Sequence, residues 1–408
     1  MLFNWPTFGG GNVHTVQLAR CLQAAGLTVR HLFAEYPPWG VGAVNGDCPF
    51  PSERLAFSDA TWSVSSIRER FRRALRESDP DFVLITDAWN TKPLLAEAAV
   101  DFAYVLRIDA QECLCPLNNI RLRPSSNGSP TQCNRNFPST PDECVACVRT
   151  NERVSGPLHL LERGLGWSTE RYHERMIQSL RQAYAVLAVN PSVAAMIEPF
   201  ATTVHSIPPG IDPQCFLGSE AAPHSPPIRV FFLGNPDDPL KGFTVLHDAC
   251  AKLWQRRQDF RLLCTAEPPG LIDAFTERIG WCPHSSLPTL LNETDIVAVP
   301  SVCQDAMPIV ALEAMAAARP IVASRIGGLQ YSVADGLTGL LFSPGDSADL
   351  ACKLALLLND ASLRTRMGYA GRRRVEERYS WNALIRKYYL PLFQRPGHGA
   401  PLATKAIT

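Results

Sequence analysis

The sequence predicts an α/β protein of two doubly wound domains with a cleft between them, and three observations lead to this prediction. Short apolar runs alternate with amphipathic stretches, a pattern typical of βαβ units and parallel sheets. At 408 residues the chain is long for a single core and suits two domains of ordinary size. A segment rich in proline and turn-forming residues, 208–227, separates two halves that both show the pattern, and we interpret it as the interdomain linker.

The expected elements follow one another in order along each half. In the first half, 1–207, the expected strands are 81–87, 102–109, 185–190 and 203–208. In the second half, 228–378, the expected strands are 228–235, 260–266, 295–301, 320–324 and 339–342, with helical runs such as 243–256 and 348–359 between them. We expect a last helix over 379–393 and a disordered tail over 394–408. Sheets of this kind bind ligands at the carboxyl ends of their strands.

Composition and charge exclude several classes of protein. The hydrophobic fraction of 46% and the charged fraction of 19% are those of a soluble globular protein. Because the formal net charge is zero, there is no electrostatic reason to expect nucleic acid as a partner. No apolar run reaches the roughly 18 residues of a membrane span, and the first residues lack the pattern of a secretory signal, so we expect a cytoplasmic protein. The thirteen cysteines are an odd number and do not indicate a disulfide framework.

Two carboxylates, Asp305 and Glu313, stand eight positions apart after the expected strand 295–301. Pro308 suits the first turn of a helix, which places Glu313 one to two turns into it. Both acids then lie beside a helix N-terminus whose free N–H groups attract anions. Such a pair suits the hydroxyls of a sugar or ribose, with phosphate at the helix end. A surface aspartate and a glutamate near a helix start are the alternative, and the spacing alone does not separate the two.

The segment 299–329, VPSVCQDAMPIVALEAMAAARPIVASRIGGL, resembles the paired-acid motif of the retaining glycosyltransferases of family 4. Further matches to the family occur in its order at 9–29, 206–212, 233–243 and 335–346. The resemblance implies the GT-B fold of two facing Rossmann-like domains, with the acceptor on the N-terminal side, the nucleotide sugar on the C-terminal side, and a last helix that crosses back. It also implies transfer of a sugar from a nucleotide diphosphate to a glycan or lipid-linked acceptor, with retention at the anomeric carbon and no catalytic metal.

The same resemblance assigns roles to individual residues. Glu313 would bind the ribose hydroxyls of the donor, and Asp305 would lie near the transferred sugar. Lys241 would neutralise the diphosphate as charge develops on the leaving group. The other residues that we expect around the donor are Gly234, Asn235, Gly10, Gly11, Met307, Pro308 and Ile309.

Three positions depart from the usual pattern of the family. Asp305 stands where the family usually has glutamate, and Asn235 stands where it commonly has arginine. The loss of that guanidinium removes a charge-assisted contact to phosphate. Ile108 stands where a histidine is frequent, so we assign no catalytic histidine. Asp109 and Glu112 are then candidates for contact with the acceptor, and a role at the edge of the core or on the surface is the alternative for both.

Three glycines precede the first amphipathic helix. We expect Gly9, Gly10 and Gly11 to form a loop in which backbone N–H groups approach a phosphate or the acceptor. A tight turn between a strand and a helix is the alternative, and the two interpretations are compatible. His14 follows at the start of the helix, either lining the cleft or serving as a cap or packing residue.

A block rich in cysteine, 112–148, is not expected from the fold. The spacing of Cys144 and Cys147 suits two ligands of one tetrahedral metal ion, and Cys115 and Cys133 would complete a structural zinc site. Unliganded thiols in an acceptor loop are the alternative. In either case a loop of this kind would influence the choice of acceptor.

A basic amphipathic helix is expected over 66–78. Its arginines would allow peripheral contact with anionic lipid at the inner face of the membrane, or they would form the solvated face of a helix packed on its own sheet. Two other functions stand beside the active transferase. One is a degenerate relative that binds a nucleotide sugar without transferring it, and the other is a zinc-stapled interaction protein.

Overall fold

The computed structural model divides the chain into two compact units. The first unit is Met1–Pro209 together with Leu384–Thr408, and the second is Gly210–Ala383. The structure describes residues 10–39, 50–86, 88, 91–117, 121–123, 131–151, 165, 171–216, 226–265, 273–280 and 282–394. Within these ranges no helix combines the length and the apolar character that crossing a bilayer demands.

The second unit is built on one six-stranded sheet with the order β11-β10-β9-β12-β13-β14. Every neighbouring pair in it is parallel. Val230 of the central strand β9 pairs with Leu262 on one side and with Ile296 on the other. The strands are β9 (Ile228–Phe232), β10 (Phe260–Cys264), β11 (Thr276–Arg278), β12 (Ile296–Val299), β13 (Ile321–Ser324) and β14 (Gly339–Phe342). Most are continuous apolar runs because both faces of the sheet are covered.

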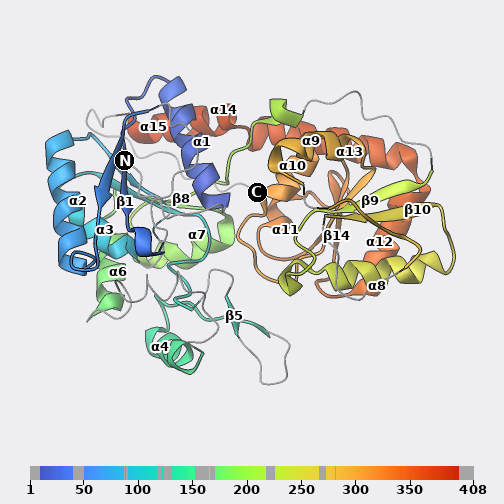
Figure 1. The fold of residues 1–408 in the computed structure, drawn as a ribbon, viewed down its shortest axis with the longest axis horizontal. Coiled ribbons are helices and arrows are strands. Elements are labelled where there is room, and N and C mark those ends of the chain that lie inside the picture. The colour runs from blue at the N-terminus through green and yellow to red at the C-terminus, as the bar shows by residue number, and fades with distance from the viewer. Residues whose placement is uncertain are drawn as a thin grey trace. The chain divides into compact units, whose positions relative to one another are not determined.

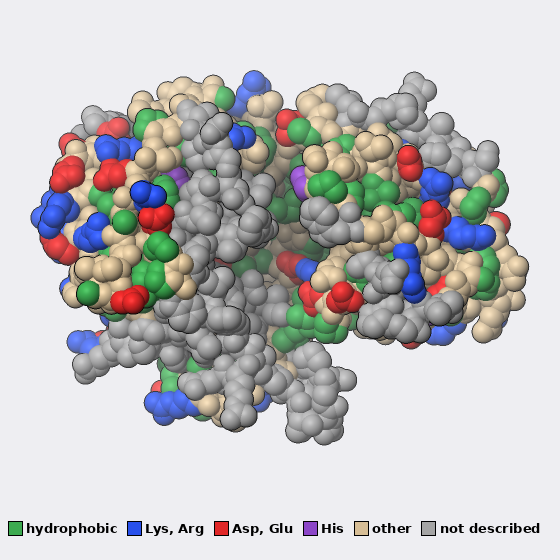
Figure 2. All heavy atoms as spheres, viewed as in Figure 1, with side chains coloured by type: hydrophobic (Ala, Val, Ile, Leu, Met, Phe, Trp, Pro, Cys, Tyr) green, Lys and Arg blue, Asp and Glu red, His purple; other side chains and the backbone are tan. Residues whose placement is uncertain are grey.

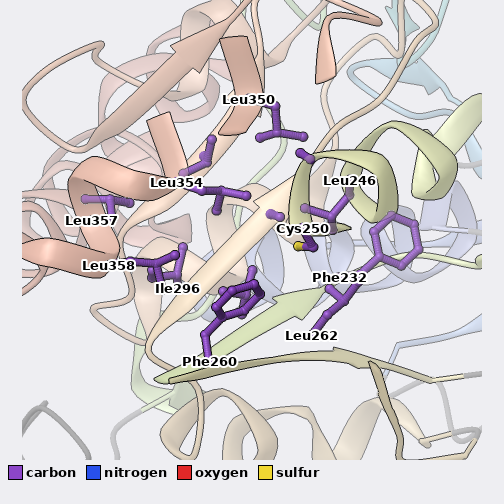
Figure 3. Close-up of a cluster of buried hydrophobic side chains, with 14 of the residues drawn as sticks. Phe232, Leu246, Cys250, Phe260, Leu262, Ile296, Leu350, Leu354, Leu357 and Leu358 are labelled. Atoms are coloured by element: carbon purple, nitrogen blue, oxygen red, sulfur yellow. The ribbon is translucent and has the colours of Figure 1, made fainter. Parts of the chain in front are cut away.

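Helices cover both faces of this sheet (Figure 1). One layer consists of α8 (Phe243–Trp254) and α12 (Ser347–Asn359). The other contains α9 (Leu287–Asn292), α10 (Ile309–Ala316), α11 (Leu329–Ser332) and α13 (Ala361–Arg378). Leu246 and Leu354, from the two helices of the first layer, pack with Phe232 of the sheet in one buried cluster (Figure 3). The spacing of leucine and alanine that predicted these helices is therefore the spacing of their buried faces.

The first unit contains a four-stranded parallel sheet with the order β3-β4-β7-β8. Its strands are β3 (Val83–Ile85), β4 (Tyr104–Ile108), β7 (Ala185–Ala188) and β8 (Val204–Ser206). A separate parallel pair, β1 (His31–Glu35) and β2 (Ser52–Ala56), was not predicted. The main helices are α1 (Gly10–Ala24), α2 (Val64–Ser78), α3 (Lys92–Ala98), α6 (Tyr172–Gln182) and α7 (Pro191–Ile197).

From Gly210 onward, the segment expected to be a linker belongs to the second unit. Ile211 and Phe216 are buried in its core, and Phe216 ends a short 3-10 helix, Pro213–Phe216. The Ile211 N–H donates to the carbonyl of Tyr379 at 2.9 Å, which fastens this stretch to the end of α13. The remainder of the expected linker that the structure describes is 226–227, because 217–225 lie outside the described residues.

The last helix is not a single regular element. It consists of α14 (Trp381–Leu384), a π-helical segment η8 (Ile385–Tyr389) and α15 (Leu390–Phe393). The part from Leu384 onward belongs to the first unit. A π turn widens the helix by one residue per turn and rotates the side chains that follow it. The expected disordered tail lies outside the described residues except for Gln394.

Candidate functional site

An ion pair joins Lys241 and Asp305 in the second unit. Lys241 ends the short 3-10 helix η6 (Pro239–Lys241) after β9, and Asp305 lies in the loop between β12 and α10. The Nζ atom of Lys241 is 2.9 Å from Oδ2 of Asp305. Burial works against the charge on Lys241, but the carboxylate of Asp305 outweighs it and raises the pKa of the ammonium group. Lys241 is therefore cationic at neutral pH.

The two loops that carry this pair are packed backbone to backbone. β9 and β12 are parallel neighbours, so the loops that follow them leave the sheet at the same edge. Gly242 has φ +75°, and a Cβ added there would lie 1.9 Å from the carbonyl oxygen of Pro300. The Val302 N–H donates to the carbonyl of Leu240 at 2.9 Å. A side chain at Gly242 would force these loops apart, because it would both clash and require a left-handed backbone.

Two adjacent glycines, Gly327 and Gly328, hold the acidic loop from the other side. The N–H of Gly328, which follows β13, donates to the carbonyl of Asp305 at 2.8 Å. A Cβ at Gly328 would lie 2.2 Å from the carbonyl oxygen of Ala306, and one at Gly327 would lie 2.3 Å from that of Asp305. These glycines had no role in the prediction from sequence, although they stand just before a helix, α11, and glycines just before a helix are the signal that singled out Gly10 and Gly11.

Glu313 is the buried carboxylate of this region. It lies in α10, a helix that is apolar on all sides and begins just after Pro308, as the proline predicted. Oε1 of Glu313 is 2.5 Å from Nε2 of His284, whose side chain is 73% exposed. The hydrogen bond with Glu313 raises the pKa of His284. Sequence reasoning missed this histidine, because nothing local connects it with a glutamate 29 residues away.

The remaining residues expected around the donor fall into two groups. Met307 and Pro308 are buried in the acidic loop, and Ile309 opens α10. A Cβ at Gly234 would lie 3.5 Å from Cβ of Lys241, so Gly234 belongs to the same place. Asn235 is exposed, and its side-chain oxygen accepts the N–H of Asp237 at 3.1 Å. It therefore serves a turn, and the carboxamide brings no positive charge to this position.

The expectation that Gly10 and Gly11 lie in a loop is wrong. Both belong to α1, which begins at Gly10. The first turn of a helix tolerates glycine because its N–H groups have no partner within the helix, and those groups remain able to bind a ligand. Gly9 lies outside the described residues. Gly10 and Gly11 belong to the first unit, whereas the other residues expected around the donor belong to the second.

The two acids considered for the acceptor behave differently. Glu112 is buried, and its two oxygens accept the backbone N–H groups of Asp109 at 3.3 Å and Ala110 at 2.9 Å. It also pairs with the ammonium group of Lys92 at 3.2 Å. Glu112 therefore supports the fold of its own loop, which is the alternative role at the edge of the core. Asp109 keeps one oxygen outside this framework.

Four cysteines line one small cavity of about 20 Å³ in the first unit, which is enough for a single ion or water. They are Cys115, Cys133, Cys144 and Cys147. The last two come from α4 (Pro141–Thr150), which lies next to β5 (Leu122–Arg123) in Figure 1. Among the described residues, however, no group of three or more metal-ligating side chains has the spacing that a bound ion requires. The thiols are thus gathered in one place without forming a closed coordination shell.

The basic helix α2 packs on its own unit, as the second interpretation of it predicted. Its buried face is formed by Ile67, Phe71, Ala74 and Leu75. Arg68 pairs with Glu97 at 3.2 Å, and Arg76 pairs with Asp101 at 3.0 Å. Side chains of both charges alternate over the visible described surface of this unit (Figure 2). On the face that Figure 2 shows, the described side chains do not gather into a positive patch of the kind that anionic lipid attracts.

Comparison with known proteins adds independent findings. A model described as glycosyl transferase 4-like domain matches residues 9–210, and one described as glycosyl transferases group 1 matches residues 227–360. The chain is 31% identical over 219 residues to an MMP α-(1→4)-mannosyltransferase of Mycolicibacterium hassiacum, which is 50% of this chain and 52% of that protein. The chain spans about half or less of the length of the curated relatives it matches.

Solved structures resemble the fold over nearly the whole chain. A sucrose-phosphate synthase from Thermosynechococcus elongatus matches with a TM-score of 0.65 and 18% identity, covering 96% of this chain and 98% of that one. The HepE protein of Anabaena, in complex with UDP and glucose, matches with a TM-score of 0.64 and 14% identity over the same shares of both chains. At these identities the likeness concerns the fold.

Proposed function

We propose that this chain, which belongs to the glycosyl transferases group 1 family and has the GT-B fold, is a sugar transferase. In this proposal the sugar comes from a nucleotide diphosphate. The receiving group in this proposal is a hydroxyl of a glycan or lipid-linked acceptor, and the anomeric configuration is retained. The observation that carries the proposal is the ion pair of Lys241 and Asp305, held at the carboxyl edge of the sheet by paired glycines.

The donor would lie along this edge of the second unit. Glu313, a buried carboxylate, suits the two hydroxyls of a ribose, because a carboxylate accepts from both at once. Lys241 supplies the positive charge for the diphosphate, together with backbone N–H groups at the start of α10. The similar structure of the Anabaena HepE protein contains UDP and glucose, which supports a nucleotide sugar as the class of donor.

The chemistry follows from the charges of Lys241 and Asp305. As the bond between the anomeric carbon and the phosphate oxygen breaks, its electron pair passes to the phosphate, where the ammonium of Lys241 stabilises the new charge. Positive charge develops on the sugar ring, where the carboxylate of Asp305 stabilises it. The acceptor hydroxyl attacks from the face that the phosphate leaves, and its proton passes to the phosphate oxygen. The catalytic step uses no metal ion in this proposal.

Calorimetric titration with UDP and with GDP tests the donor site. We expect one nucleotide to bind, and we expect Glu313→Ala and Lys241→Ala each to weaken binding about tenfold or more. Glu293→Ala and Lys252→Ala are matched controls, because both side chains are exposed elsewhere on the same unit and should change little. If the folded protein bound neither nucleotide, the proposal would be wrong.

One observation favours a second candidate function, binding of a nucleotide sugar without transfer. Asn235 is neutral and engaged in a turn, so this position lacks the phosphate-binding arginine that the family commonly has there. Sugar transfer from the nucleotide that binds, with a cell extract as the source of acceptor, separates the two functions. Product formation supports the transferase. Binding without product, restored to transfer by Asn235→Arg, would support the degenerate relative.

We also propose that the four cysteines hold a structural zinc ion. They share one cavity, and Arg121 is buried within electrostatic range of Cys115, Cys133 and Cys144. A zinc ion bound by four thiolates carries a net negative charge, which this guanidinium would partly balance. A zinc site of this kind would stabilise the loop of 112–148 without joining the reaction.

The place of action is proposed as the cytoplasm, with peripheral contact at the inner face of the membrane where the acceptor is lipid-linked. The pairing of Arg68 and Arg76 within the first unit means that α2 would contribute little to such contact. Flotation with vesicles of anionic and of neutral lipid tests the membrane part of the proposal. Equal absence from both vesicle fractions would contradict it.

A further inference from the structure

A buried network of charges lies at the carboxyl end of β4 in the first unit. Arg107, the penultimate residue of the strand, is fully buried, and its Nε donates to Oδ1 of Asp109 at 2.6 Å. Lys92, also buried, pairs with Glu112 at 3.2 Å. Each cation thus has its own carboxylate, and the four charges sum to zero. A network without excess charge provides little attraction for an anion.

The Arg107 and Asp109 pair has unused hydrogen-bonding capacity. Oδ2 of Asp109 and Nη2 of Arg107 are both buried and have no hydrogen-bond partner within the described part of the chain. The first can accept a hydrogen bond and the second can donate one. A hydroxyl group does both, since its oxygen accepts while its proton is donated. Buried polar atoms of native proteins rarely lack hydrogen-bond partners, so we expect a ligand to supply a partner for these two atoms.

Neighbouring residues fix the position of this pair. The Nη1 of Arg107 donates to the hydroxyl of Tyr389 at 2.9 Å, and Glu112 binds the N–H of Asp109. His14 of α1 lies with Nδ1 4.0 Å from Oδ1 of Asp109. Burial lowers the pKa of His14 to about 4, so at neutral pH it adds no positive charge. The carboxylate is therefore pre-organised in a neutral environment, which favours recognition of a neutral polar group.

We propose that Asp109 and Arg107 bind a hydroxyl of the acceptor, and that the acceptor presents a neutral sugar or polyol here rather than a phosphate or carboxylate group. The inference rests on the proposed function and adds to it the chemical class of the acceptor. It assigns Asp109 to binding and Glu112 and Tyr389 to positioning. From the sequence alone, Asp109 and Glu112 had the same possible roles, and their contacts in the structure now distinguish those roles.

Binding of defined sugars tests the proposal. The protein is first saturated with UDP or GDP, whichever binds. Saturation-transfer NMR then measures the binding of two sets of ligands, namely the methyl α-glycosides of glucose, galactose and mannose and the 6-phosphates of the same hexoses. We expect at least one neutral glycoside to bind more tightly than its phosphate. Asp109→Asn should weaken that binding about tenfold, the loss typical of one hydrogen bond to a charged group. Asp101→Asn is the matched control, because its carboxylate pairs with Arg76 on the surface of the same unit.

The readouts separate this inference from the function on which it rests. Asp109→Asn should leave the nucleotide affinity within error. The melting temperature should fall, because the buried guanidinium of Arg107 loses the carboxylate that balances it, so glycoside binding is compared at a temperature at which both proteins are folded. A purely structural Asp109 would lower the melting temperature without a selective loss of glycoside binding. Three outcomes would overturn the inference. They are tighter binding of the hexose phosphates than of the glycosides, equal binding of the glycosides to the native protein and to Asp109→Asn, and no binding of any glycoside. Failure to bind either nucleotide would instead count against the proposed function.

Discussion

The ammonium group of Lys241 lies 2.9 Å from the carboxylate of Asp305, so the two charges proposed to act on the leaving group and on the sugar form a pair with each other. A diphosphate that binds Lys241 must compete with this carboxylate. The pair therefore holds the lysine in place and also reduces the charge that it offers to the donor. Substitution of the acid should separate the two effects.

We expect Asp305→Asn to bind the nucleotide about threefold more tightly, because a partly exposed ion pair of under 1 kcal/mol no longer competes. The rate of sugar transfer should fall about 100-fold, since the carboxylate beside the ring is lost. Titration calorimetry and a transfer assay measure the two quantities. Asp305→Glu serves as the control and should retain transfer. Unchanged transfer in Asp305→Asn would show that this acid takes no part in the reaction.

The contact between His284 and Glu313 predicts a dependence of nucleotide affinity on pH. The pKa of His284 is raised by the hydrogen bond with Glu313, so protonated His284 occupies the carboxylate more firmly at low pH. Affinity should rise as the pH passes upward through this raised pKa, which lies above the ordinary histidine value of about 6.5. The terminal phosphate of the nucleotide titrates in the same range, and for this reason the difference between the native protein and His284→Gln is the measured quantity. Parallel pH profiles would contradict the prediction.

The same pair makes a prediction about stability with a definite sign. A histidine whose pKa is higher in the folded than in the unfolded state stabilises the fold below its unfolded pKa, and this contribution disappears as the pH rises through the folded pKa. Because His284 is mostly exposed, the effect should be small. Melting temperatures of the native protein and His284→Gln should differ below the ordinary histidine pKa of about 6.5 and converge as the pH rises well above it. A constant difference across this range would argue against the pair.

Two glycines with nearly the same φ test the packing of the lysine loop. Gly242 has φ +75°, and an added Cβ would lie 1.9 Å from the carbonyl oxygen of Pro300, whereas Gly336 has φ +76° and an added Cβ would meet no atom within 4 Å. Gly336→Ala should cost about 1 kcal/mol, the strain of a left-handed alanine. Gly242→Ala should cost roughly 3 kcal/mol or more and weaken nucleotide binding, since it displaces the loop of Lys241. Urea unfolding gives both values, and equal losses would contradict the packing argument.

The cavity lined by four cysteines predicts a metal-dependent stability. Purified protein should contain about one zinc ion per chain, and a strong chelator should lower the melting temperature while leaving nucleotide affinity unchanged. Cys144→Ser should lose the metal, whereas Cys352→Ser, an exposed thiol of the second unit, should keep it. Atomic emission measures the metal content. Equal, negligible zinc in all three proteins would favour free thiols in the loop.

Five of the six strands in the sheet of the second unit were predictable because they are apolar and largely buried, whereas β11, which is mostly exposed, was not predicted. Strand β14 was predicted without error, and β9, β10 and β12 were found one to three residues shorter than expected at one or both ends. Strand β2, with the sequence SERLA, was missed, since only Leu55 in it is buried and an edge strand carries no apolar run. The start of helix α1 at Gly10 was missed for a different reason. Glycine has no conformational preference strong enough to mark where a helix begins.

By itself, the sequence determined the α/β class, the proline that opens α10, and the small set of residues on which a donor site would depend. Those features are local, or they repeat with a period that a linear pattern records. The tertiary structure alone decided that His284 meets Glu313 and that Gly328 binds the loop of Asp305. It also decided that Glu112 is a support, while one oxygen of Asp109 has no hydrogen-bond partner among the described residues. Contacts of this kind join residues from different elements, and their existence depends on burial, which a sequence does not display.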